Sequence, residues 1–444
     1  MLFTTDTQTI EDLNIFGRQA TDQTVFGIFN QCLTKGGSAI LEQMFRNPLS
    51  NHSAINNRSG TIRYFASNGM AFPFRPDLFP QIEQYLAITD ERTRLVEKNQ
   101  PLVVKTKQWV APETETVLLQ QGVRSVVQLL QSVFNFISSA PVLKAGFYAE
   151  ERTAIAYLLS IPDFADALAA PAKLSSAMVS GLDSVFRFRN RSNLRDLLKY
   201  CYQLDVYTAT AKVAVQHGFA FADAVINGDA LIDLDGFYHP TLVQAVPNTI
   251  RIDHEHNIVF LTGANMAGKS TLMKALSLAV YLAHMGFPLA AKSMKFTVMN
   301  GIYTTINLPD NLSIGASHFY TEVLRLKKIA GELANGARLF IVFDELFRGT
   351  NVKDAFEATI AVTGAFANRR NSLFIISTHI MEAGEVLQKG YDNIRFTYLP
   401  TGLDGNKPIY TYSLKNGISS DRHGMVIVRN EGILQMLEEG AWEI

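Results

Sequence analysis

The segment that most restricts the fold joins an apolar run to a helix through a glycine-rich loop. Ile258–Thr262 is short and largely apolar, as expected of a strand buried in a parallel sheet. The next residues, Gly263-Ala-Asn-Met-Ala-Gly-Lys-Ser270, fit the pattern G-x-x-x-x-G-K-[ST], and helical periodicity continues from Lys269 to about Met285. A loop between a strand and a helix N-terminus presents backbone N–H groups to phosphate oxygens. The segment therefore predicts a nucleotide-phosphate site at the end of a strand.

Two side chains of this loop suit ATP bound with Mg²⁺. Lys269 is expected to contact the β- and γ-phosphates, and the hydroxyl of Ser270 is expected to ligate Mg²⁺. ATP and Mg²⁺ are therefore the predicted cofactors. The residues predicted to contact the nucleotide are Gly263, Ala264, Asn265, Met266, Ala267, Gly268, Lys269, Ser270 and Thr271.

A second apolar run, Leu339–Phe343, ends directly in two carboxylates, Asp344 and Glu345. Adjacent acidic groups at the end of a buried strand are costly unless a cation or a reacting water lies beside them. Asp344 has the chemistry of a Mg²⁺ ligand, direct or through water, and Glu345 that of the general base for attack on the γ-phosphate. Asp-Glu also occurs at ordinary exposed strand ends, but the loop upstream favours the catalytic interpretation.

A third apolar run, Leu373–Ser377, is followed by Thr378 and His379. In open α/β sheets, ligands bind outside the carboxyl ends of the strands. His379 is therefore expected at the same sheet edge as the loop and the two carboxylates. We predict that His379 is a catalytic residue that senses the γ-phosphate; the alternative is a structural histidine at a strand end.

The pattern of apolar residues changes between residues 225 and 235. Before this point, apolar residues recur three and four apart. The segments with this helical spacing are Val117–Phe136, Glu150–Leu159, Phe164–Ser180 and Asn193–His217. After this point, short apolar runs alternate with amphipathic helices, which is typical of βαβ units around a parallel sheet. The sequence predicts an all-α domain over residues 1–230 and an α/β domain with a mostly parallel sheet over residues 231–444.

The composition excludes several classes of protein. Hydrophobic residues make up 47% and charged residues 18% of the chain, which is ordinary for a globular protein and unlike disorder. A net charge of −1 excludes a dedicated polycationic nucleic-acid binder, but not DNA contact through one local face. Two cysteines are too few for a disulfide scaffold, and neither a signal peptide nor a bilayer-spanning segment is visible. We therefore expect a cytoplasmic protein without membrane contact.

Residues 186–195, Phe-Arg-Phe-Arg-Asn-Arg-Ser-Asn-Leu-Arg, contain four arginines and two phenylalanines. Such a cluster could bind a phosphate backbone, with the aromatic rings packing on sugars or bases. The simpler interpretation is a solvated strand or turn whose arginines pair with Asp183 and Asp196. We favour the simpler one, because a charge cluster in an otherwise neutral region is usually surface.

Four motifs, in this order along the chain, resemble the MutS family of DNA mismatch-repair ATPases, within the wider ABC-type ATPase class. The loop Gly263–Thr271 is similar to the family's G-P-N-M-G-G-K-S-T, and the Asn-Met pair inside it is distinctive. Asp310–Glu322 resembles the signature D-D-x-x-x-G-x-S-T-F-x-x-E. Asp344–Thr350 is similar to D-E-x-G-R-G-T, and Ser377–His379 is similar to A-T-H.

The resemblance implies a helical core, or lever, domain followed by a P-loop ATPase domain of the ABC type. It also implies a homodimer through the ATPase domain, because the family's serine that matches Ser317 points at the γ-phosphate held by the opposite subunit. The alternative role for Ser317 is a helix cap. Duplex or branched DNA is the partner that the resemblance suggests.

The chain also departs from the family pattern. Members that recognise mismatches carry an N-terminal domain with an F-x-E wedge, whereas this chain starts at the part that resembles the core. We therefore expect the mismatch-recognition and connector domains to be absent, and the sequence supports ATP chemistry but not mismatch recognition. The run Ala245-Val-Pro-Asn248 replaces the family's aromatic partner for adenine, which leaves the contact with the base unassigned.

Three functions follow as hypotheses. The first is a dimeric, Mg²⁺-dependent ATPase that couples ATP binding and hydrolysis to DNA association, in mismatch repair or a related repair or recombination role. The second keeps the ATPase but replaces DNA by a protein or ribonucleoprotein partner. The third is a scaffold that binds ATP without turnover. Salt-dependent binding to DNA separates the first two, and release of phosphate separates the third from both.

Overall fold

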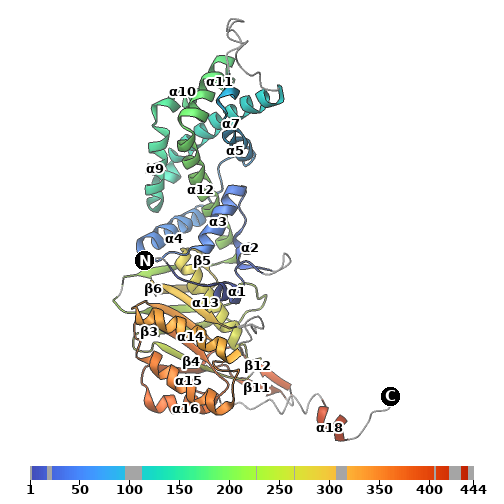
Figure 1. The fold of residues 1–444 in the computed structure, drawn as a ribbon, viewed down its shortest axis with the longest axis vertical. Coiled ribbons are helices and arrows are strands. Elements are labelled where there is room, and N and C mark those ends of the chain that lie inside the picture. Colours follow the sequence, from blue (N-terminus) through green and yellow to red (C-terminus); the bar gives the residue numbers. More distant parts are fainter. Residues whose placement is uncertain are drawn as a thin grey trace. The chain divides into compact units, whose positions relative to one another are not determined.

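The computed structural model describes residues 3–17, 23–95, 113–226, 228–264, 266–306, 318–404, 407–419 and 432–438. These residues form two compact units, each held by its own internal contacts. The sheet unit comprises the described parts of Met1–Ile28, Phe45–Ser59 and Ala214–Ile444, and the helical unit those of Phe29–Met44 and Gly60–Val213. Figure 1 shows the course of the chain in both.

The helical unit is built from helices whose buried side chains recur with the period of an α-helix. In its long helix α7 (Glu113–Ile137), Leu119, Val123, Val126 and Leu130 are buried and form one apolar stripe. The other helices are α5 (Leu78–Ala87), α8 (Ala140–Lys144), α9 (Ala149–Leu159), α10 (Ala165–Leu168), α11 (Ser176–Asp183) and α12 (Arg191–His217, which extends into the sheet unit). Two further helices contribute residues to both units, α3 (Lys35–Arg46) and α4 (His52–Ser67).

Shorter helical turns connect these helices. They are the 3₁₀ turns η1 (Glu91–Thr93), η2 (Gly146–Tyr148) and η3 (Pro162–Phe164), and the π-helical turn η4 (Ser184–Arg189). Three of the four predicted helical segments are confirmed as α7, α9 and α12. The fourth, Phe164–Ser180, is interrupted between α10 and α11, where Pro171 and the turn around it break the helix.

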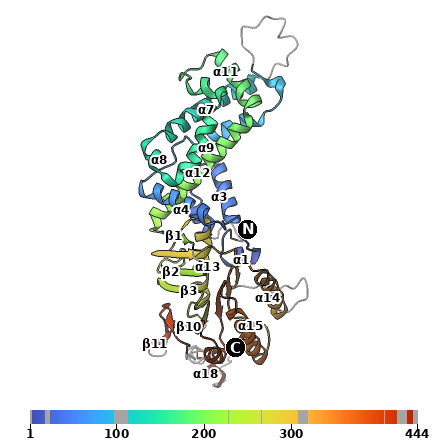
Figure 2. The same ribbon diagram turned by 90° about the vertical axis from the view of Figure 1, so that its left-hand side faces the viewer.

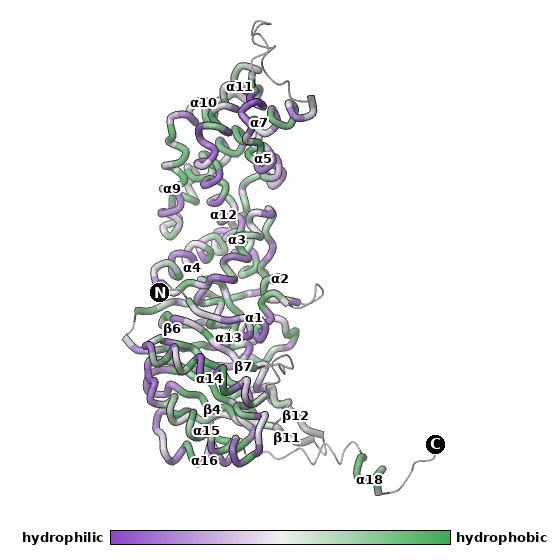
Figure 3. The backbone as a smooth tube through the Cα atoms, in the orientation of Figure 1, coloured by the Kyte–Doolittle hydropathy of each residue, from purple (hydrophilic) through white to green (hydrophobic). Residues whose placement is uncertain are grey.

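A six-stranded sheet in the order β13-β10-β4-β9-β8-β7 forms the first layer of the sheet unit. Its strands are β4 (Ile258–Thr262), β7 (Gly301–Thr305), β8 (Leu339–Phe343), β9 (Leu373–Ser377), β10 (Ile394–Tyr398) and the short β13 (Lys415–Asn416). All pairs are parallel except β10 with β13. The central strands are buried on both faces, which explains their continuous hydrophobic runs (Figure 3).

A second, five-stranded sheet has the order β3-β2-β6-β1-β5 and contains antiparallel pairs. Its strands are β1 (Ala220–Val225), β2 (Leu231–Phe237), β3 (Asn248–Asp253), β5 (Pro288–Leu289) and β6 (Ser293–Thr297). Strands β11 (Thr401–Asp404) and β12 (Lys407–Tyr410) form a separate hairpin. The sequence did not predict this sheet, and β1 lies inside the segment that was predicted to be all-α.

Helices cover both faces of the six-stranded sheet. On one side, Ile329, Phe366 and Leu387 of three helices share a core with the strand residues Ile341 and Phe374. These helices are α14 (His318–Ala334), α15 (Val352–Ala367) and α16 (Met381–Gly390). Figures 1 and 2 both show α14 and α15 grouped on this side.

Helix α13 (Lys269–Met285) contacts strands of both sheets, namely β1, β2, β5 and β7. It is buried almost from end to end, which explains the uncharged run over residues 275–283. Three short helices complete the sheet unit, α1 (Thr7–Asp12), α2 (Val25–Phe29, whose last residue belongs to the helical unit) and α18 (Ile433–Glu438). None of the helices in the described residues is long and apolar enough to span a bilayer.

The boundaries between the two units differ from the single domain boundary that was predicted at residue 230. The described parts of segments 1–28, 45–59 and 214–230, which the sequence assigned to the first domain, cluster with the sheet unit. The mixed α/β character of the chain is nevertheless plain from its helices and two sheets.

Candidate nucleotide site

The glycine-rich loop connects the end of β4 to the start of α13, as its sequence predicted. Gly263 and Gly268 have φ values of 143° and 98°, and Met266 has 70°. A Cβ on Gly268 would lie 2.9 Å from the ring of Tyr412, so both the backbone angle and the close contact require glycine here. Ala267 does not adopt a positive φ, which explains why alanine is accepted in place of the glycine of the MutS motif.

Lys269 is folded back onto this loop. Its Nζ donates to the carbonyl oxygens of Gly263 at 2.8 Å and Ala264 at 3.2 Å, and the side chain is buried. Burial lowers the pKa of Lys269, and the charges of Glu345 and Asp344 oppose that shift. The ammonium group is thus held inside the loop, in the position where the motif predicts contact with phosphate.

Asp344, the first residue after β8, connects the glycine-rich loop to the end of the neighbouring strand β9. One of its carboxylate oxygens accepts a hydrogen bond from the hydroxyl of Ser270, and the other accepts one from Ser377. Burial raises the pKa of Asp344, and the two hydrogen bonds oppose that shift. A hydroxyl and a carboxylate in contact are hard oxygen donors of the kind that Mg²⁺ prefers, so Ser270 and Asp344 fit the predicted metal site.

The next residue, Glu345, has an unusual backbone. Its φ is 54°, and its N–H donates to Oγ of Ser377 at 3.0 Å. Arg348 Nη1 lies 3.6 Å from a carboxylate oxygen of Glu345. A non-glycine residue in this region is strained, and such strain is typical of residues whose position matters for function.

His379 follows β9, which pairs with β4 on one side and β8 on the other. The ends of β4, β8 and β9 therefore lie at one edge, and His379 is exposed there. Two predicted site residues, Asn265 in the loop and Ser317 in the signature, lie outside the described residues, as does the signature from residue 310 to 317.

A cavity of about 360 Å³ opens beside the start of α13. It is lined by Gly268 of the loop and Thr271 of α13, together with Ala245, Val246 and Tyr412. Its remaining lining residues are Phe237, Tyr238, His239, Leu242, Val243, Gln244, Asn248, Leu272 and Ala275. The cavity therefore adjoins the glycine-rich loop.

Tyr412 supplies an aromatic ring from a segment far along the chain from the Ala245–Asn248 run. Asn248 holds it in place, because its Nδ2 donates to the carbonyl oxygen of Tyr412 at 2.9 Å and its Oδ1 accepts from the N–H of Leu414 at 2.7 Å. Reasoning from the sequence missed both Tyr412 and the role of Ser377. No local pattern marks Tyr412, whereas Ser377 lies in the quoted Ser377–His379 motif.

Glu322 is a further buried acid close to the site. It accepts a hydrogen bond from the backbone N–H of Phe347, two residues after Glu345. Burial raises the pKa of Glu322 to about 7, against the opposing effects of this hydrogen bond and of Arg348. Since Glu322 belongs to α14, it connects this helix to the loop that carries Asp344 and Glu345.

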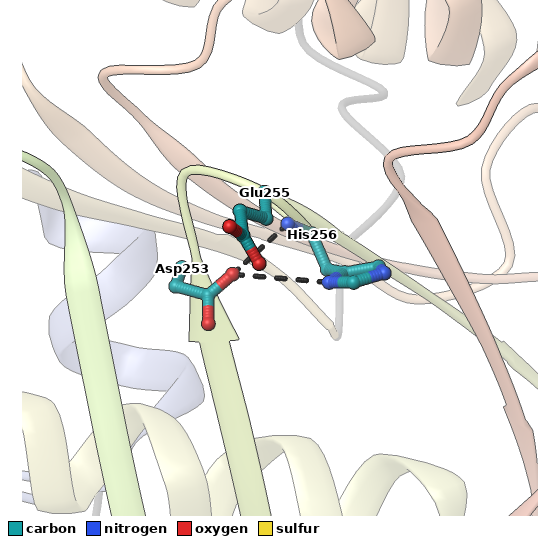
Figure 4. Close-up of side chains that lie close together, drawn as sticks. All are labelled: Asp253, Glu255 and His256. Carbon is teal, nitrogen blue, oxygen red and sulfur yellow. Dashed lines mark hydrogen bonds and ion pairs between the residues drawn. The ribbon is translucent and has the colours of Figure 1, made fainter.

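A separate group of titratable side chains lies at the turn between β3 and β4, at the end of β4 remote from the nucleotide loop. Figure 4 shows Asp253, Glu255 and His256 close together there. Asp253 already accepts hydrogen bonds from the Nε of Arg251 at 2.9 Å and the N–H of His256 at 3.0 Å. These bonds close a tight turn, and a structural role accounts for the group.

The arginine-rich segment is helical, so the prediction of a solvated strand or turn was wrong. It comprises the end of η4 and the start of α12. Arg187 is fully buried, forms an ion pair with Asp183 at 2.6 Å and donates to Thr93 Oγ1 at 2.8 Å. The predicted pairing with Asp183 is confirmed, and Arg187 cannot contact a phosphate backbone. Asp196 pairs instead with Lys199.

Comparison with known families agrees with this arrangement. The family model for MutS domain III matches residues 8–211, and that for MutS domain V matches residues 259–443. The two matches cover most of the described chain in the order helical part, then sheet part. The chain therefore belongs to the MutS family.

Curated relatives include proteins named DNA mismatch repair protein MutS from three bacteria. The protein of Fusobacterium nucleatum is 27% identical over 267 residues, which cover 59% of this chain and 28% of the relative. The protein of Persephonella marina is 28% identical over 245 residues, or 54% and 28% of the two chains. That of Thermus aquaticus is 28% identical over 248 residues, or 55% and 29%. The matched region thus spans less than a third of each of these relatives.

Proposed function

We propose that this chain is a Mg²⁺-dependent ATPase with a P-loop fold of the ABC type, whose nucleotide state controls its association with DNA. The observation that carries the proposal is the contact between Ser270 and Asp344. It brings the phosphate loop and the carboxylate after β8, which are 74 residues apart, to one point at the sheet edge. A chance glycine-rich turn has no reason to make this contact.

Each residue of the site has a distinct task in the proposed reaction. The loop N–H groups and Lys269 bind the phosphates, and Ser270 and Asp344 hold Mg²⁺, which neutralises charge on the phosphate oxygens when bound. Glu345 accepts a proton from the water that attacks the γ-phosphate, so that ADP and inorganic phosphate are formed. His379 contacts the γ-phosphate in this scheme.

The adenine base is proposed to stack on Tyr412 in the adjoining cavity. Tyr412 takes the place of the aromatic residue that the Ala245–Asn248 run does not provide. Asn248 binds the backbone carbonyl of Tyr412 and the N–H of Leu414, and thereby helps to fix the ring next to Gly268. An aromatic face provides a stacking surface for any base.

Binding of ATP to the Lys269→Ala variant tests the proposal. Removal of the ammonium group should weaken binding of Mg²⁺-ATP at least about 100-fold, because the charge-assisted contact of the buried Lys269 side chain with the phosphates is lost. Isothermal titration calorimetry measures the affinity, and Lys199→Ala, which removes an exposed lysine of the helical unit, is the matched control. Equal ATP affinity for wild type and Lys269→Ala would refute the proposal.

Association with DNA is proposed on family membership, and a protein or ribonucleoprotein partner is the alternative. Binding to duplex and branched DNA, with and without ATP, separates the two. DNA binding through phosphates should weaken steeply as salt rises. Absence of DNA binding at low salt, together with ATP turnover, would favour the alternative. Binding of ATP without release of phosphate would instead indicate a scaffold.

A further inference from the structure

Residues 4–12 pack along the outer edge of the six-stranded sheet. Strand β7 is the last strand of that sheet, and Thr4 forms a parallel bridge with Gly301 at its start. The N–H of Thr4 donates to Asn300 O at 2.8 Å, and the N–H of Ile302 donates to Thr4 O at 3.0 Å. A Cβ on Gly301 would lie 2.2 Å from the Thr4 side chain, so glycine is needed for this close approach.

Helix α1 then bonds to the other end of β7. Asp12 accepts hydrogen bonds from the hydroxyl of Thr304 at 2.8 Å and from the N–H of Ile306 at 2.9 Å. The hydroxyl of Thr9 accepts one from the N–H of Thr304 at 3.0 Å. Asp12 and Thr9 are both buried. The polar groups at the end of β7 are thus satisfied by α1 rather than by another strand.

Arg325 of α14 joins the same arrangement through Asp6, the N-cap residue of α1. Its two terminal nitrogens donate to the two carboxylate oxygens of Asp6 at 2.9 and 3.2 Å. Its Nε donates to Thr305 Oγ1 at 2.7 Å, and Nη2 also donates to Thr304 O. The side chains of Arg325 and Asp6 are only 11% and 16% exposed. A bidentate, partly buried pair with these additional bonds fixes geometry more strongly than a surface ion pair.

The charges agree with this geometry. Burial opposes ionisation of Asp6, but the hydrogen bonds and the charge of Arg325 outweigh it and lower the pKa of Asp6. The carboxyl group of Asp6 is therefore ionised at neutral pH. The pair of Asp6 and Arg325 connects the end of β7 to α14, and Glu322 connects the same helix to the loop that carries Glu345.

We propose that residues 4–12 are a positioning element of the ATPase. Asp6, through Arg325, sets the orientation of α14 relative to the end of β7 and thereby the geometry in which ATP is hydrolysed. This inference rests on the proposed ATPase function and adds a region of the chain remote from the nucleotide loop. Asp6 and Arg325 are positioning residues, since neither contacts the loop or the two carboxylates after β8 through any hydrogen bond or ion pair found among the described residues.

The variants Asp6→Asn and Arg325→Gln test the proposal. Asparagine keeps a side-chain oxygen that can cap α1, so it removes the charge while leaving the cap to Thr9. Both variants should lower kcat for ATP about tenfold or more while KM and the affinity for ATP change less than twofold. The double variant should be no worse than the more affected single variant, because both remove the same contact.

Lys328→Gln is the matched control. Lys328 also lies on α14 and contacts Asp6 at 3.3 Å, but its side chain is 51% exposed. An exposed pair of this kind contributes little, so kcat should stay at the wild-type value. Arg325→Lys keeps the charge but not the two parallel bonds, and should recover only part of kcat.

A purely stabilising role would give a different result. Loss of a purely stabilising contact would lower the unfolding temperature but leave kcat unchanged below that temperature. An unchanged kcat in folded Asp6→Asn and Arg325→Gln would therefore overturn the proposal. Hydrogen exchange gives a second measurement that does not depend on turnover: ATP should protect α14 amides in wild type and Lys328→Gln but not in Asp6→Asn. ATP-dependent protection retained in Asp6→Asn also overturns it. If wild type neither binds nor hydrolyses ATP, the proposed function itself fails.

Discussion

A substitution at Glu345 should strongly lower ATP turnover without weakening ATP binding. In Glu345→Gln the amide preserves the size of the side chain but cannot accept a proton from water, while Asp344 and Lys269 stay intact. We expect ATP affinity within about twofold of wild type and a turnover rate lowered about 100-fold or more. Single-turnover measurements with radiolabelled ATP check this, with Glu357→Gln on the exposed face of α15 as control. An unchanged rate would show that Glu345 is not the base.

Glu322 should make the stability of the sheet unit depend on pH. Its pKa is raised from 4.5 to about 7 in the folded protein, so the folded state favours the protonated form. The resulting stabilisation is present below about pH 4.5 and is lost as the pH rises through 7. Glu322→Gln, which is neutral at every pH, removes this dependence.

Urea unfolding of wild type and Glu322→Gln between pH 5 and pH 8 provides the measurement. The free energy of unfolding of wild type should fall relative to the variant with rising pH, by at most about 1.4 kcal/mol per pH unit for one proton. The exposed Glu357→Gln should run parallel to wild type. If the free energy of unfolding of Glu322→Gln also runs parallel to that of wild type, the pKa of the Glu322 carboxyl group is not raised.

At the scale of elements, the turn η4 depends on one buried ion pair. Arg187 and Asp183 are both fully buried, and Asp183 also accepts hydrogen bonds from the hydroxyl of Tyr85 at 2.9 Å and the N–H of Leu95 at 3.0 Å. Arg187→Met should destabilise the helical unit by about 3–5 kcal/mol, because it leaves a buried carboxylate without its cation. Chemical denaturation followed by circular dichroism measures the loss. Arg195→Met, at an exposed position of α12, should cost less than about 0.5 kcal/mol.

The strands that the sequence predicted are those buried on both faces. β4, β8 and β9 have continuous apolar runs, and their carboxyl ends carry the loop, Asp344-Glu345 and His379. The five-stranded sheet escaped prediction because its strands are half-buried and short, and charged residues such as Asp233 and Lys295 interrupt their apolar pattern. The π-helical turn η4 was not predicted either, because the sequence alone does not distinguish the buried Arg187 from the exposed arginines around it.

At the scale of the whole molecule, the contacts that the sequence could not indicate are those between distant segments. Asp6 and Arg325 are 319 residues apart, and Asn248 and Tyr412 are 164 apart. No periodicity or spacing connects such residues, because only the folded topology brings them together. For the same reason the division into units differs from a single cut at residue 230, since the described parts of segments 1–28 and 45–59 belong to the sheet unit.

The last prediction concerns assembly into a dimer with ATP between the subunits. Val243, which lines the cavity, and Met266 in the loop are 99% and 74% exposed, so two apolar side chains near the proposed nucleotide site face solvent. A second subunit would cover them and, as the family resemblance implies, bring its Ser317 to the γ-phosphate. Lys269→Ala and Ser317→Ala should each be nearly inactive alone. Mixed in equal amounts they should recover about a quarter of wild-type turnover, because half of the dimers then contain one complete site of two.

The mixture distinguishes a shared site from one built within a single subunit. If Ser317 served the loop of its own chain or only capped α14, each subunit would stay defective and mixing would restore nothing. The control is a mixture of Ser317→Ala with the double variant Lys269→Ala/Ser317→Ala, in which every dimer lacks a complete site. Recovery in the first mixture but not in the second supports the shared site. Equal activity in both mixtures means that the two subunits do not complete each other's site.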